Sequence, residues 1–142
     1  MTPPQPVIIF TGNNSKSLPS GKIRELTRRI YSGEKISFLR STNLVCCTDY
    51  RIRRLNRIYR GIDRATDVLS FPFDDEDFLG EIYISIRRTE VQARRFGLSF
   101  NEEFCRLFIH GILHLIGYDH MSLRDQTAMN RKENHYLQKN VY

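Results

Sequence analysis

Residues 108–120 read FIHGILHLIGYDH and contain three of the four histidines of this 142-residue chain, His110, His114 and His120. His110 and His114 are four residues apart, so on a helix their imidazoles project from the same face, one turn apart. Gly117 follows three residues later, where a glycine permits the left-handed turn that often ends a helix. We expect the chain to turn back there and to bring His120 toward the other two imidazoles.

Three imidazoles in this pattern predict a metal site. Imidazole nitrogen binds zinc at about 2.0–2.1 Å, and three protein ligands leave the fourth position to water, as in catalytic sites. A single His-x3-His pair often arises by chance, but a third histidine after a glycine turn makes coincidence a poor explanation. We expect one Zn²⁺ per chain, held by His110, His114 and His120. Imidazole also suits nickel, copper and iron, so another divalent metal stays open.

The helix that carries His110 and His114 is expected to lie at the centre of the fold. Ser99 or Asn101 can cap its start, and Gly117 marks its end. Its apolar residues lie nearly all round, which is typical of a buried helix. A helix buried in this way holds its histidines rigidly, as a catalytic metal site requires.

The rest of the chain alternates short apolar runs with amphipathic segments, and it contains no repeat, low-complexity tract or linker. Strands are predicted at Val7–Thr11, Ile36–Leu39, Leu44–Thr48, Asp67–Phe71 and Leu79–Ile86, with the acidic loop Asp74–Asp77 joining the last two. Further helices are predicted after an N-cap at Ser20, over Asp49–Tyr59 with Ile52, Leu55 and Ile58 turned inward, over Arg88–Phe96 and over Leu123–Gln138. We expect residues 1–142 to form a single α+β domain, with a mixed, mostly four-stranded sheet packed by helices around a central metal-binding helix.

The chain is basic, with 22 Lys and Arg against 16 Asp and Glu and a formal net charge of +6. Its arginines gather in two runs, one from Arg51 to Arg64 and one from Arg87 to Arg95. Because the planar guanidinium group suits phosphate, these runs favour an anionic partner, nucleic acid above all. A solvated basic surface is the alternative.

We expect a cytoplasmic protein. No apolar stretch approaches the roughly 20 residues of a membrane span. The start, MTPPQPVIIFTGN, has neither the basic region nor the long apolar core of a secretory signal. Cys46, Cys47 and Cys105 are an odd set with two adjacent members, which is a poor disulfide framework, so we expect buried reduced thiols.

The spacing His-x3-His-x2-Gly-x2-His is also that of the metzincin metalloproteases, in which a glutamate follows the first histidine and acts as the general base. In this chain Gly111 stands at that position. The loss of a general base typically costs about 10²–10⁴ in rate. A metallopeptidase is therefore the least favoured enzyme.

Together with two upstream blocks, the histidine segment resembles the YbeY family of bacterial rRNA maturation factors. HGILHLIGYDH is similar to the family's HGxLHLxGYDH signature. LNRIYRGIDRATDVLSFPF, at Leu55–Phe73, is similar to its arginine and VLSFP block, and LGEIYIS, at Leu79–Ser85, to its LGDI block. The blocks stand in family order over residues 40–120, with Glu81 in place of an expected aspartate.

The resemblance implies a zinc-dependent, single-strand-specific endoribonuclease that acts in rRNA processing, notably at the 3′ end of 16S rRNA, and in ribosome quality control. It implies His110, His114 and His120 as metal ligands, with Arg60 and His114 as catalytic residues. The implied partners are single-stranded rRNA and the small ribosomal subunit, with neither DNA nor a membrane. A zinc-bound water forms hydroxide near neutral pH, and Arg60 can bind the phosphodiester charge, but attack by the 2′-hydroxyl of the RNA is an equal alternative.

Other residues near these blocks have less specific roles. Arg60, Asp67 and Ser70 are expected to contact the substrate, although Arg60 also fits a solvated basic row and the other two also fit a strand end. Asp119 is expected to orient an imidazole from outside the ligand set. Because the usual general base is missing, a ribosome-assembly binding factor with a structural metal is the main alternative to the enzyme.

Overall fold

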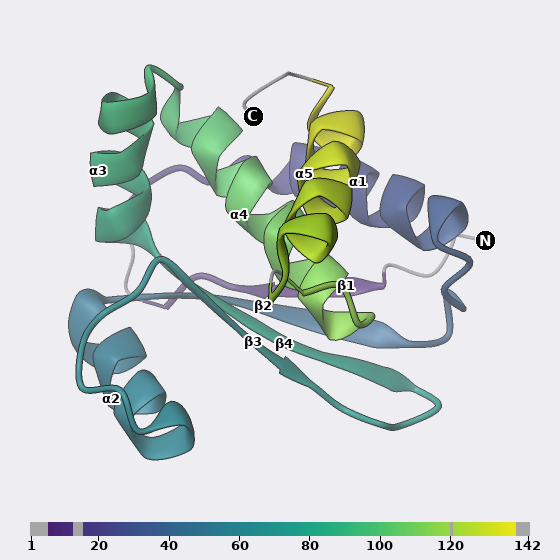
Figure 1. Cartoon of the computed structure of the whole chain (residues 1–142), viewed down its shortest axis with the longest axis horizontal. Helices are drawn as coiled ribbons and strands as arrows, with labels where there is room; N and C mark the ends of the chain where they lie inside the picture. Colours follow the sequence, from purple (N-terminus) through teal and green to yellow (C-terminus); the bar gives the residue numbers. More distant parts are fainter. Residues whose placement is uncertain (1–5, 13–15, 120, 139–142) are drawn as a thin grey trace.

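The computed structural model describes residues 6–12, 16–119 and 121–138 and forms one sheet with helices on both faces (Figure 1). The strands are β1 (Val7–Phe10), β2 (Ser41–Cys47), β3 (Val68–Pro72) and β4 (Phe78–Ser85). The helices are α1 (Ser20–Gly33), α2 (Asp49–Arg60), α3 (Ile86–Phe96), α4 (Phe100–Leu115) and α5 (Leu123–Leu137). The predicted α+β class is confirmed.

The four strands form one mixed sheet in the order β1-β2-β4-β3. β2 runs parallel to both β1 and β4, whereas β3 pairs antiparallel with β4. Parallel neighbours need a long crossover connection, and α1 supplies it between β1 and β2. The acidic segment Asp74–Asp77 lies in the connection between β3 and β4, as predicted. The mixed four-stranded sheet is therefore confirmed, and β3 forms one of its edges.

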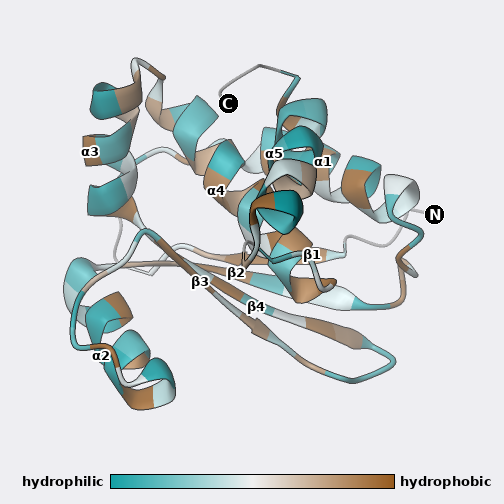
Figure 2. Cartoon of the chain, viewed as in Figure 1, coloured by the Kyte–Doolittle hydropathy of each residue, from teal (hydrophilic) through white to brown (hydrophobic). Residues whose placement is uncertain are grey.

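Alternating side chains of the sheet divide the interior into two apolar cores. On one face, Ile82 and Ile84 belong to the larger core with α1, α4 and α5. On the other face, Val45 and Tyr83 meet Ile52 of α2 in a smaller core. Figure 1 shows α2 alone on its side of the sheet, and Figure 2 shows that most of its residues are hydrophilic and a few are hydrophobic. Most of the apolar interior therefore lies under the helix that carries the histidines.

Helix α4 is the centre of the larger core and contacts β3, β4, α1, α3 and α5. Between Glu103 and Leu115, every residue except His110 and His114 is buried. Ser99 caps the helix, because its hydroxyl accepts from the backbone N–H of Glu102 and its own N–H donates to the Glu102 carboxylate, each at 3.1 Å. The predicted central, buried helix is confirmed, and Ser99 rather than Asn101 is its cap.

Helix α4 lies so close to the sheet at Gly111 that no side chain fits there. A Cβ atom on Gly111 would lie 2.7 Å from Cγ2 of Ile82 on β4. Beside it, the hydroxyl of Ser70 on β3 donates to the Gly111 carbonyl oxygen at 3.0 Å. At Gly80, whose φ is +151°, an added Cβ would lie 2.7 Å from Cδ2 of Leu115. Two glycines of the quoted motifs thus allow α4 to rest directly on β3 and β4.

Near the first crossover, one predicted strand is wrong and another is confirmed with different bounds. Ile36–Leu39 forms a turn rather than a strand, because the chain reverses after α1 and the Ile36 N–H donates back to the Tyr31 carbonyl at 2.8 Å. The second strand begins at Ser41 rather than Leu44, and Thr48, predicted to end it, caps α2 by accepting from the Arg51 N–H at 3.2 Å.

Three predicted details of the helices are also wrong. Pro19 rather than Ser20 occupies the N-cap position of α1, and it makes no side-chain cap hydrogen bond. Ile58 is 57% exposed because it lies six residues after the buried Ile52, which at 3.6 residues a turn places it on another side of α2. Helix α4 ends at Leu115, two residues before Gly117, whose φ of +102° makes the left-handed turn.

The structure describes all three cysteines and most of the helical segments. Cys46, Cys47 and Cys105 are free and buried, as predicted. Burial raises the pKa of the Cys47 and Cys105 thiols to about 11 each, which disfavours the reactive thiolate at neutral pH. None of the helices in the described ranges has the length and apolar character needed to cross a membrane.

The close approach of α4 to the sheet leads to a test at Gly111. Glycine to alanine normally stabilises a helix by about 1 kcal/mol, whereas overpacking a core costs about 1–3 kcal/mol. We expect Gly111→Ala to lower the free energy of unfolding by about 1–2 kcal/mol in chemical denaturation, because overpacking prevails. Gly21→Ala is the matched control in α1, where an added Cβ meets nothing within 4 Å, and it should stabilise the protein. Equal effects of the two substitutions would contradict the close packing.

Candidate functional site

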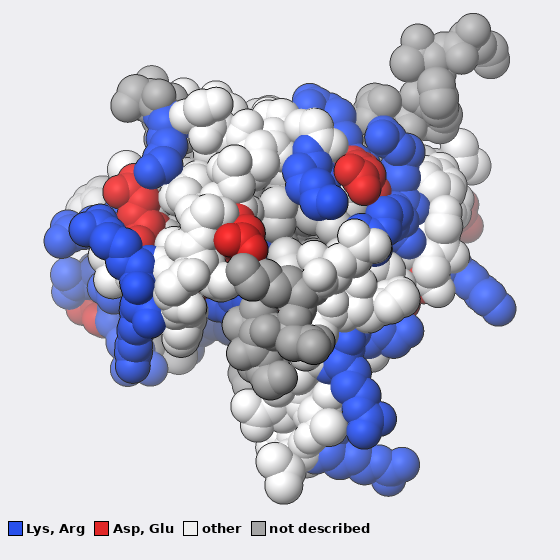
Figure 3. Space-filling view, turned by 90° about the horizontal axis from the view of Figure 1, so that it is seen from above, with Lys and Arg blue, Asp and Glu red and all other residues white. Residues whose placement is uncertain are grey.

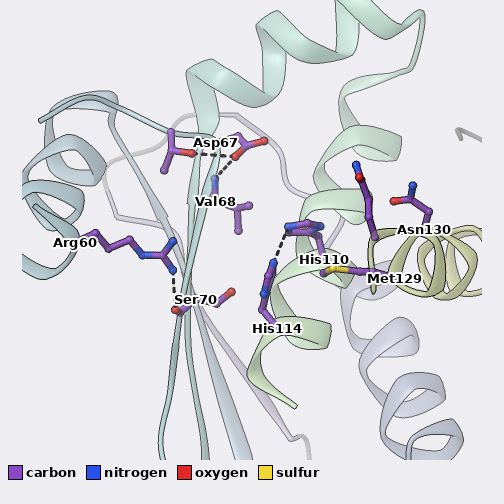
Figure 4. Close-up of a pocket in the computed structure, with 10 residues that line it drawn as sticks. Arg60, Asp67, Val68, Ser70, His110, His114, Met129 and Asn130 are labelled. Carbon is purple, nitrogen blue, oxygen red and sulfur yellow. Dashed lines mark hydrogen bonds between the residues drawn. The ribbon is translucent and has the colours of Figure 1, made fainter. Parts of the chain in front are cut away.

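The histidines of α4 open into a cavity between α4, β3 and α5 (Figure 4). The Nε2 atoms of His110 and His114 are 3.1 Å apart. In a tetrahedral metal site with metal–nitrogen distances of about 2.0–2.1 Å, two ligand nitrogens stand about 3.3 Å apart. The pair therefore has the spacing of two ligands of one tetrahedral ion, as the His-x3-His pattern predicts.

Glu133 of α5 orients the first of these imidazoles. His110 Nδ1 hydrogen-bonds to Oε1 of Glu133, whose side chain is only 1% exposed. With the Nδ1 proton directed at this carboxylate, Nε2 of His110 presents its lone pair toward His114. The bond thus selects the tautomer that a metal ligand needs.

The charge of Glu133 also bears on whether a cation fits here. Its second oxygen, Oε2, is buried and has no hydrogen-bond partner among the described residues. A buried carboxylate is costly without compensating charge or hydrogen bonds. A divalent cation between the two Nε2 atoms would supply positive charge one imidazole away. The donor set and the buried carboxylate together fit a zinc ion.

The third predicted ligand, His120, lies outside the described residues. Within the described part of the chain, no group of three or more His, Cys, Asp and Glu side chains is placed to hold a metal ion. The complete ligand set of His110, His114 and His120 therefore stays a prediction. His135, which the pattern does not include, is exposed on α5 and lines a different hollow beside Arg28 and Tyr136.

The cavity beside the histidines has a volume of about 400 Å³ and is lined mainly by polar side chains. Its lining residues are Arg60, Thr66, Asp67, Val68, Ser70, His110, His114, Gln126, Met129 and Asn130. Arg60 ends α2 and reaches over the edge strand β3, where its Nη2 lies 3.5 Å from the Ser70 carbonyl oxygen (Figure 4). That distance is the outer limit of a hydrogen bond, so the guanidinium is held only weakly and can turn to a ligand.

Asp67 and Ser70 line the cavity, but their polar atoms already have partners. Asp67 Oδ1 accepts from the Val68 N–H at 2.8 Å, and Oδ2 accepts from Gln92 at 3.0 Å. The Ser70 hydroxyl donates a hydrogen bond to the Gly111 carbonyl oxygen. Both side chains therefore hold β3 in position, and their contacts with substrate stay predictions.

Asp119 is exposed and accepts from the Met121 N–H at 3.2 Å. Its expected contact with an imidazole stays a prediction. For His110 the orienting carboxylate is Glu133, which follows it by 23 residues.

The residues of α5 are the part of the site that the sequence reasoning missed. Glu133 orients His110, while Gln126 and Asn130 bring amide groups to the cavity wall. One signal was present, because Met129, Glu133 and Tyr136 form a buried stripe on α5 at helical spacing. An ionisable residue inside such a stripe indicates a buried partner.

A second carboxylate secures the chain just after α4. Glu34, at the end of α1, accepts hydrogen bonds from Tyr118 at 2.8 Å, from Lys132 at 3.0 Å and from Tyr136. Burial alone would raise the pKa of Glu34, but the hydrogen bonds from Tyr136, Tyr118 and Lys132 together lower it below its usual value. Glu34 is therefore ionised at neutral pH and ties α1 and α5 to the segment that follows the histidine helix.

Comparison with known proteins identifies the family of this chain. The family model described as Endoribonuclease YbeY matches residues 10–141, which include all three blocks and both described histidines of the site. The chain belongs to the YbeY family. This confirms the resemblance carried by the three sequence blocks.

Individual YbeY relatives and one solved structure extend the match over most of the chain. The Endoribonuclease YbeY of Desulforamulus reducens is 45% identical over an alignment of 106 positions that covers 68% of this chain and 69% of that protein. The Endoribonuclease YbeY of Clostridium botulinum strain 657 is 35% identical over an alignment of 140 positions that covers 82% of this chain and 84% of that protein. The solution structure of TM1509 from Thermotoga maritima superposes with a TM-score of 0.64 and 34% identity, covering 95% of this chain and 88% of that one.

The contact between Glu133 and His110 leads to a test of metal affinity in this YbeY chain. Glu133→Gln keeps the size of the side chain but removes its charge, so we expect Zn²⁺ to bind about 10–100-fold more weakly. Competition with a chromophoric chelator measures this affinity, and circular dichroism verifies the fold. Glu25→Gln, at an exposed position of α1, makes the same charge change as a control. Indistinguishable affinities of the two variants would rule out the role given to Glu133.

Proposed function

We propose that this chain is a metal-dependent endoribonuclease that cleaves single-stranded RNA in the cavity between α4, β3 and α5. The observation that supports it most is the pair of imidazole Nε2 atoms, 3.1 Å apart, which lines the same cavity as the weakly held Arg60. The names of the YbeY relatives support the same reaction class.

The proposed cofactor is one Zn²⁺ per chain, with His110, His114 and His120 as ligands. When bound, zinc supplies Lewis acidity and lowers the pKa of a ligated water to near 7. The His110 side chain is 24% exposed and lines the cavity. A structural zinc site is closed by four protein ligands, whereas three histidines beside an open cavity leave one position free, which favours a catalytic metal over the structural metal of a pure binding factor.

Arg60 is the proposed phosphate-binding residue. Its planar guanidinium can donate two parallel hydrogen bonds to phosphate oxygens, and these bonds strengthen as negative charge develops in the transition state. Asn130 and Gln126, from α5, can donate to and accept from sugar hydroxyls and base edges. In unpaired RNA the base edges are accessible to such amide side chains, and this accounts for the proposed preference for single strands.

Two routes of cleavage fit this arrangement, and their products distinguish them. If water attacks the phosphorus atom, the P–O bond to the leaving nucleoside breaks and a terminal phosphomonoester remains. If the neighbouring 2′-hydroxyl attacks, the same bond breaks and a 2′,3′-cyclic phosphate forms. Asp67 is the one carboxylate among the described residues that line the cavity, and its oxygens already accept hydrogen bonds.

The geometry at Gly111 argues against a metallopeptidase. The peptidase glutamate would occupy this position, where even a Cβ would lie 2.7 Å from Ile82. The general base of a peptidase therefore has no space in this packing.

We place the reaction in the processing of ribosomal RNA, with the 3′ end of 16S rRNA as the substrate and the small ribosomal subunit as a partner. Ribosome quality control and a cytoplasmic location belong to the same proposal. The net charge of +6 supports an RNA partner. Figure 3 shows basic side chains predominating over acidic ones on the face that carries the helices.

Cleavage of a labelled single-stranded RNA tests this proposal. We expect His114→Ala to abolish cleavage because a metal ligand is lost, and Arg60→Ala to slow it about 10²–10³-fold, as removal of one transition-state donor does. His135→Ala and Arg95→Ala are the matched controls at exposed positions, and they should cleave like the wild-type protein. The proposal fails if wild-type protein, purified free of contaminating nuclease, leaves RNA intact or if His114→Ala cleaves it equally well.

The binding-factor alternative makes a different prediction in cells. A folded, metal-loaded Arg60→Ala protein that cannot cleave RNA would still support rRNA maturation if binding alone were the function. Under the nuclease proposal this variant does not restore 3′-end maturation.

A further inference from the structure

Helix α2 projects from the far side of the sheet, away from the other helices (Figure 1). Ile52 and Asn56 are its buried residues and face the smaller core. At 3.6 residues a turn, the opposite side consists of Tyr50, Arg54, Arg57 and Ile58, which we call the outer face of α2. Arg51, at the edge of this face, turns instead toward the sheet, where its guanidinium lies 5.6 Å from the centroid of the Tyr83 ring. All four residues of the outer face are exposed, Tyr50 by 75% and Ile58 by 57%. Large apolar and basic side chains thus stand together on a surface that no described element covers.

The charge of the outer face is positive, because its two arginines, Arg54 and Arg57, have no acidic residue among them. The two nearby carboxylates are engaged by other groups. Asp49 accepts from Ser85 at 2.6 Å and lies 3.6 Å from Arg88, whereas Asp63 pairs with Arg53 at 2.9 Å. The hydrogen bond from Arg53 and, more weakly, the charge of Arg57 lower the pKa of the Asp63 carboxyl. The outer face is therefore suited to an anionic ligand.

The outer face continues into the catalytic cavity along the same helix. Arg54, Arg57 and Arg60 follow at intervals of three residues, and side chains three apart are neighbours with about 5–6 Å between their Cβ atoms. Arg60, the last of them, lines the cavity that contains the histidines. A strand with one phosphate at Arg60 can thus meet further guanidinium groups as it leaves the cavity.

We propose that the outer face of α2 is a second RNA-binding surface, which holds the phosphate backbone of the substrate strand beyond the catalytic cavity. This inference rests on the proposed function, since it assigns the same RNA to both surfaces. Arg54 and Arg57 bind phosphates, and the exposed ring of Tyr50 offers a base a stacking surface. The surface adds affinity for long strands and takes no part in the chemistry.

RNA is a better occupant of this face than a protein partner. Contacts to phosphate need only positive charge and reach, which the row formed by Arg54, Arg57 and Arg60 provides. Because the outer face is continuous with Arg60, the RNA strand bound in the cavity can itself reach this face, and no second ligand is needed. The small apolar area, limited to Tyr50 and Ile58, gives a protein partner little to bury.

The test compares two double variants that remove the same charge from different helices. Arg54→Gln/Arg57→Gln alters the outer face of α2, and Arg94→Gln/Arg95→Gln alters exposed arginines of α3. Stopped-flow fluorescence anisotropy measures binding of single-stranded RNA before turnover, with oligonucleotides of about four nucleotides and of more than about 16. Circular dichroism verifies that both variants fold.

We expect Arg54→Gln/Arg57→Gln to bind the long RNA about three- to tenfold more weakly, as the loss of two exposed charge contacts should cause. The slope of log affinity against log salt should flatten by about 1.4, or roughly 0.7 for each lost phosphate contact. The short RNA should bind as it does to the wild-type protein, and the α3 variant should resemble the wild type with both RNAs.

Unchanged binding of the long RNA by the α2 variant would overturn the inference, even if that variant failed to bind a ribosomal protein. Equal weakening by both variants would also overturn it, because binding would then reflect only the total charge. Binding that follows the expected pattern in a wild-type protein that cleaves no RNA would uphold this surface while refuting the proposed nuclease.

Discussion

The contact of α4 with β3 and β4 at Gly111 is the constraint on which the rest of the site depends. Ile82 occupies the space that a side chain at position 111 would need, and Ser70 donates to the Gly111 carbonyl at the same level. Ser70 and Ile82 are paired neighbours in the sheet, so one strand pair fixes both contacts. With its inner face fixed in this way, α4 presents His110 and His114 to the cavity beside the edge strand. A helix set farther from the sheet would move both imidazoles away from Arg60.

Helix α5 carries the carboxylate that orients a histidine of α4. Glu133 directs the Nδ1 proton of His110 and leaves Nε2 to face His114, while Glu34 joins α1 and α5 to Tyr118 in the segment after α4. Both carboxylates are largely buried, and each is held by groups from another element. The cavity is lined by residues of α2, β3, α4 and α5, so the site depends on tertiary packing although its central motif is short and local.

The sequence predicts the parts of this arrangement that depend on local spacing. His-x3-His on an apolar segment indicated the buried helix and its paired imidazoles, and the alternation around Ile82 and Ile84 indicated the strand beneath it. Glu133 was missed because its partner lies 23 residues earlier and no local pattern connects them. The strand predicted at Ile36–Leu39 was wrong because the β-branched Ile36 lies in the turn after α1. There the hydrogen bond from its backbone N–H to the Tyr31 carbonyl outweighs its β-propensity. Which residues become partners across two helices depends on the packing angle between the helices. The hydrophobic periodicity of the sequence carries no information about this angle.

The central claim is that this packed histidine helix holds a metal, and metal content tests it most directly. Protein purified without chelator should contain one zinc ion per chain by elemental analysis, and His114→Ala should contain none while remaining folded. His135→Ala, altered at the exposed histidine of α5, should keep the wild-type stoichiometry. Wild-type protein that binds no divalent metal, or a His114→Ala variant that retains a full complement, would contradict the account.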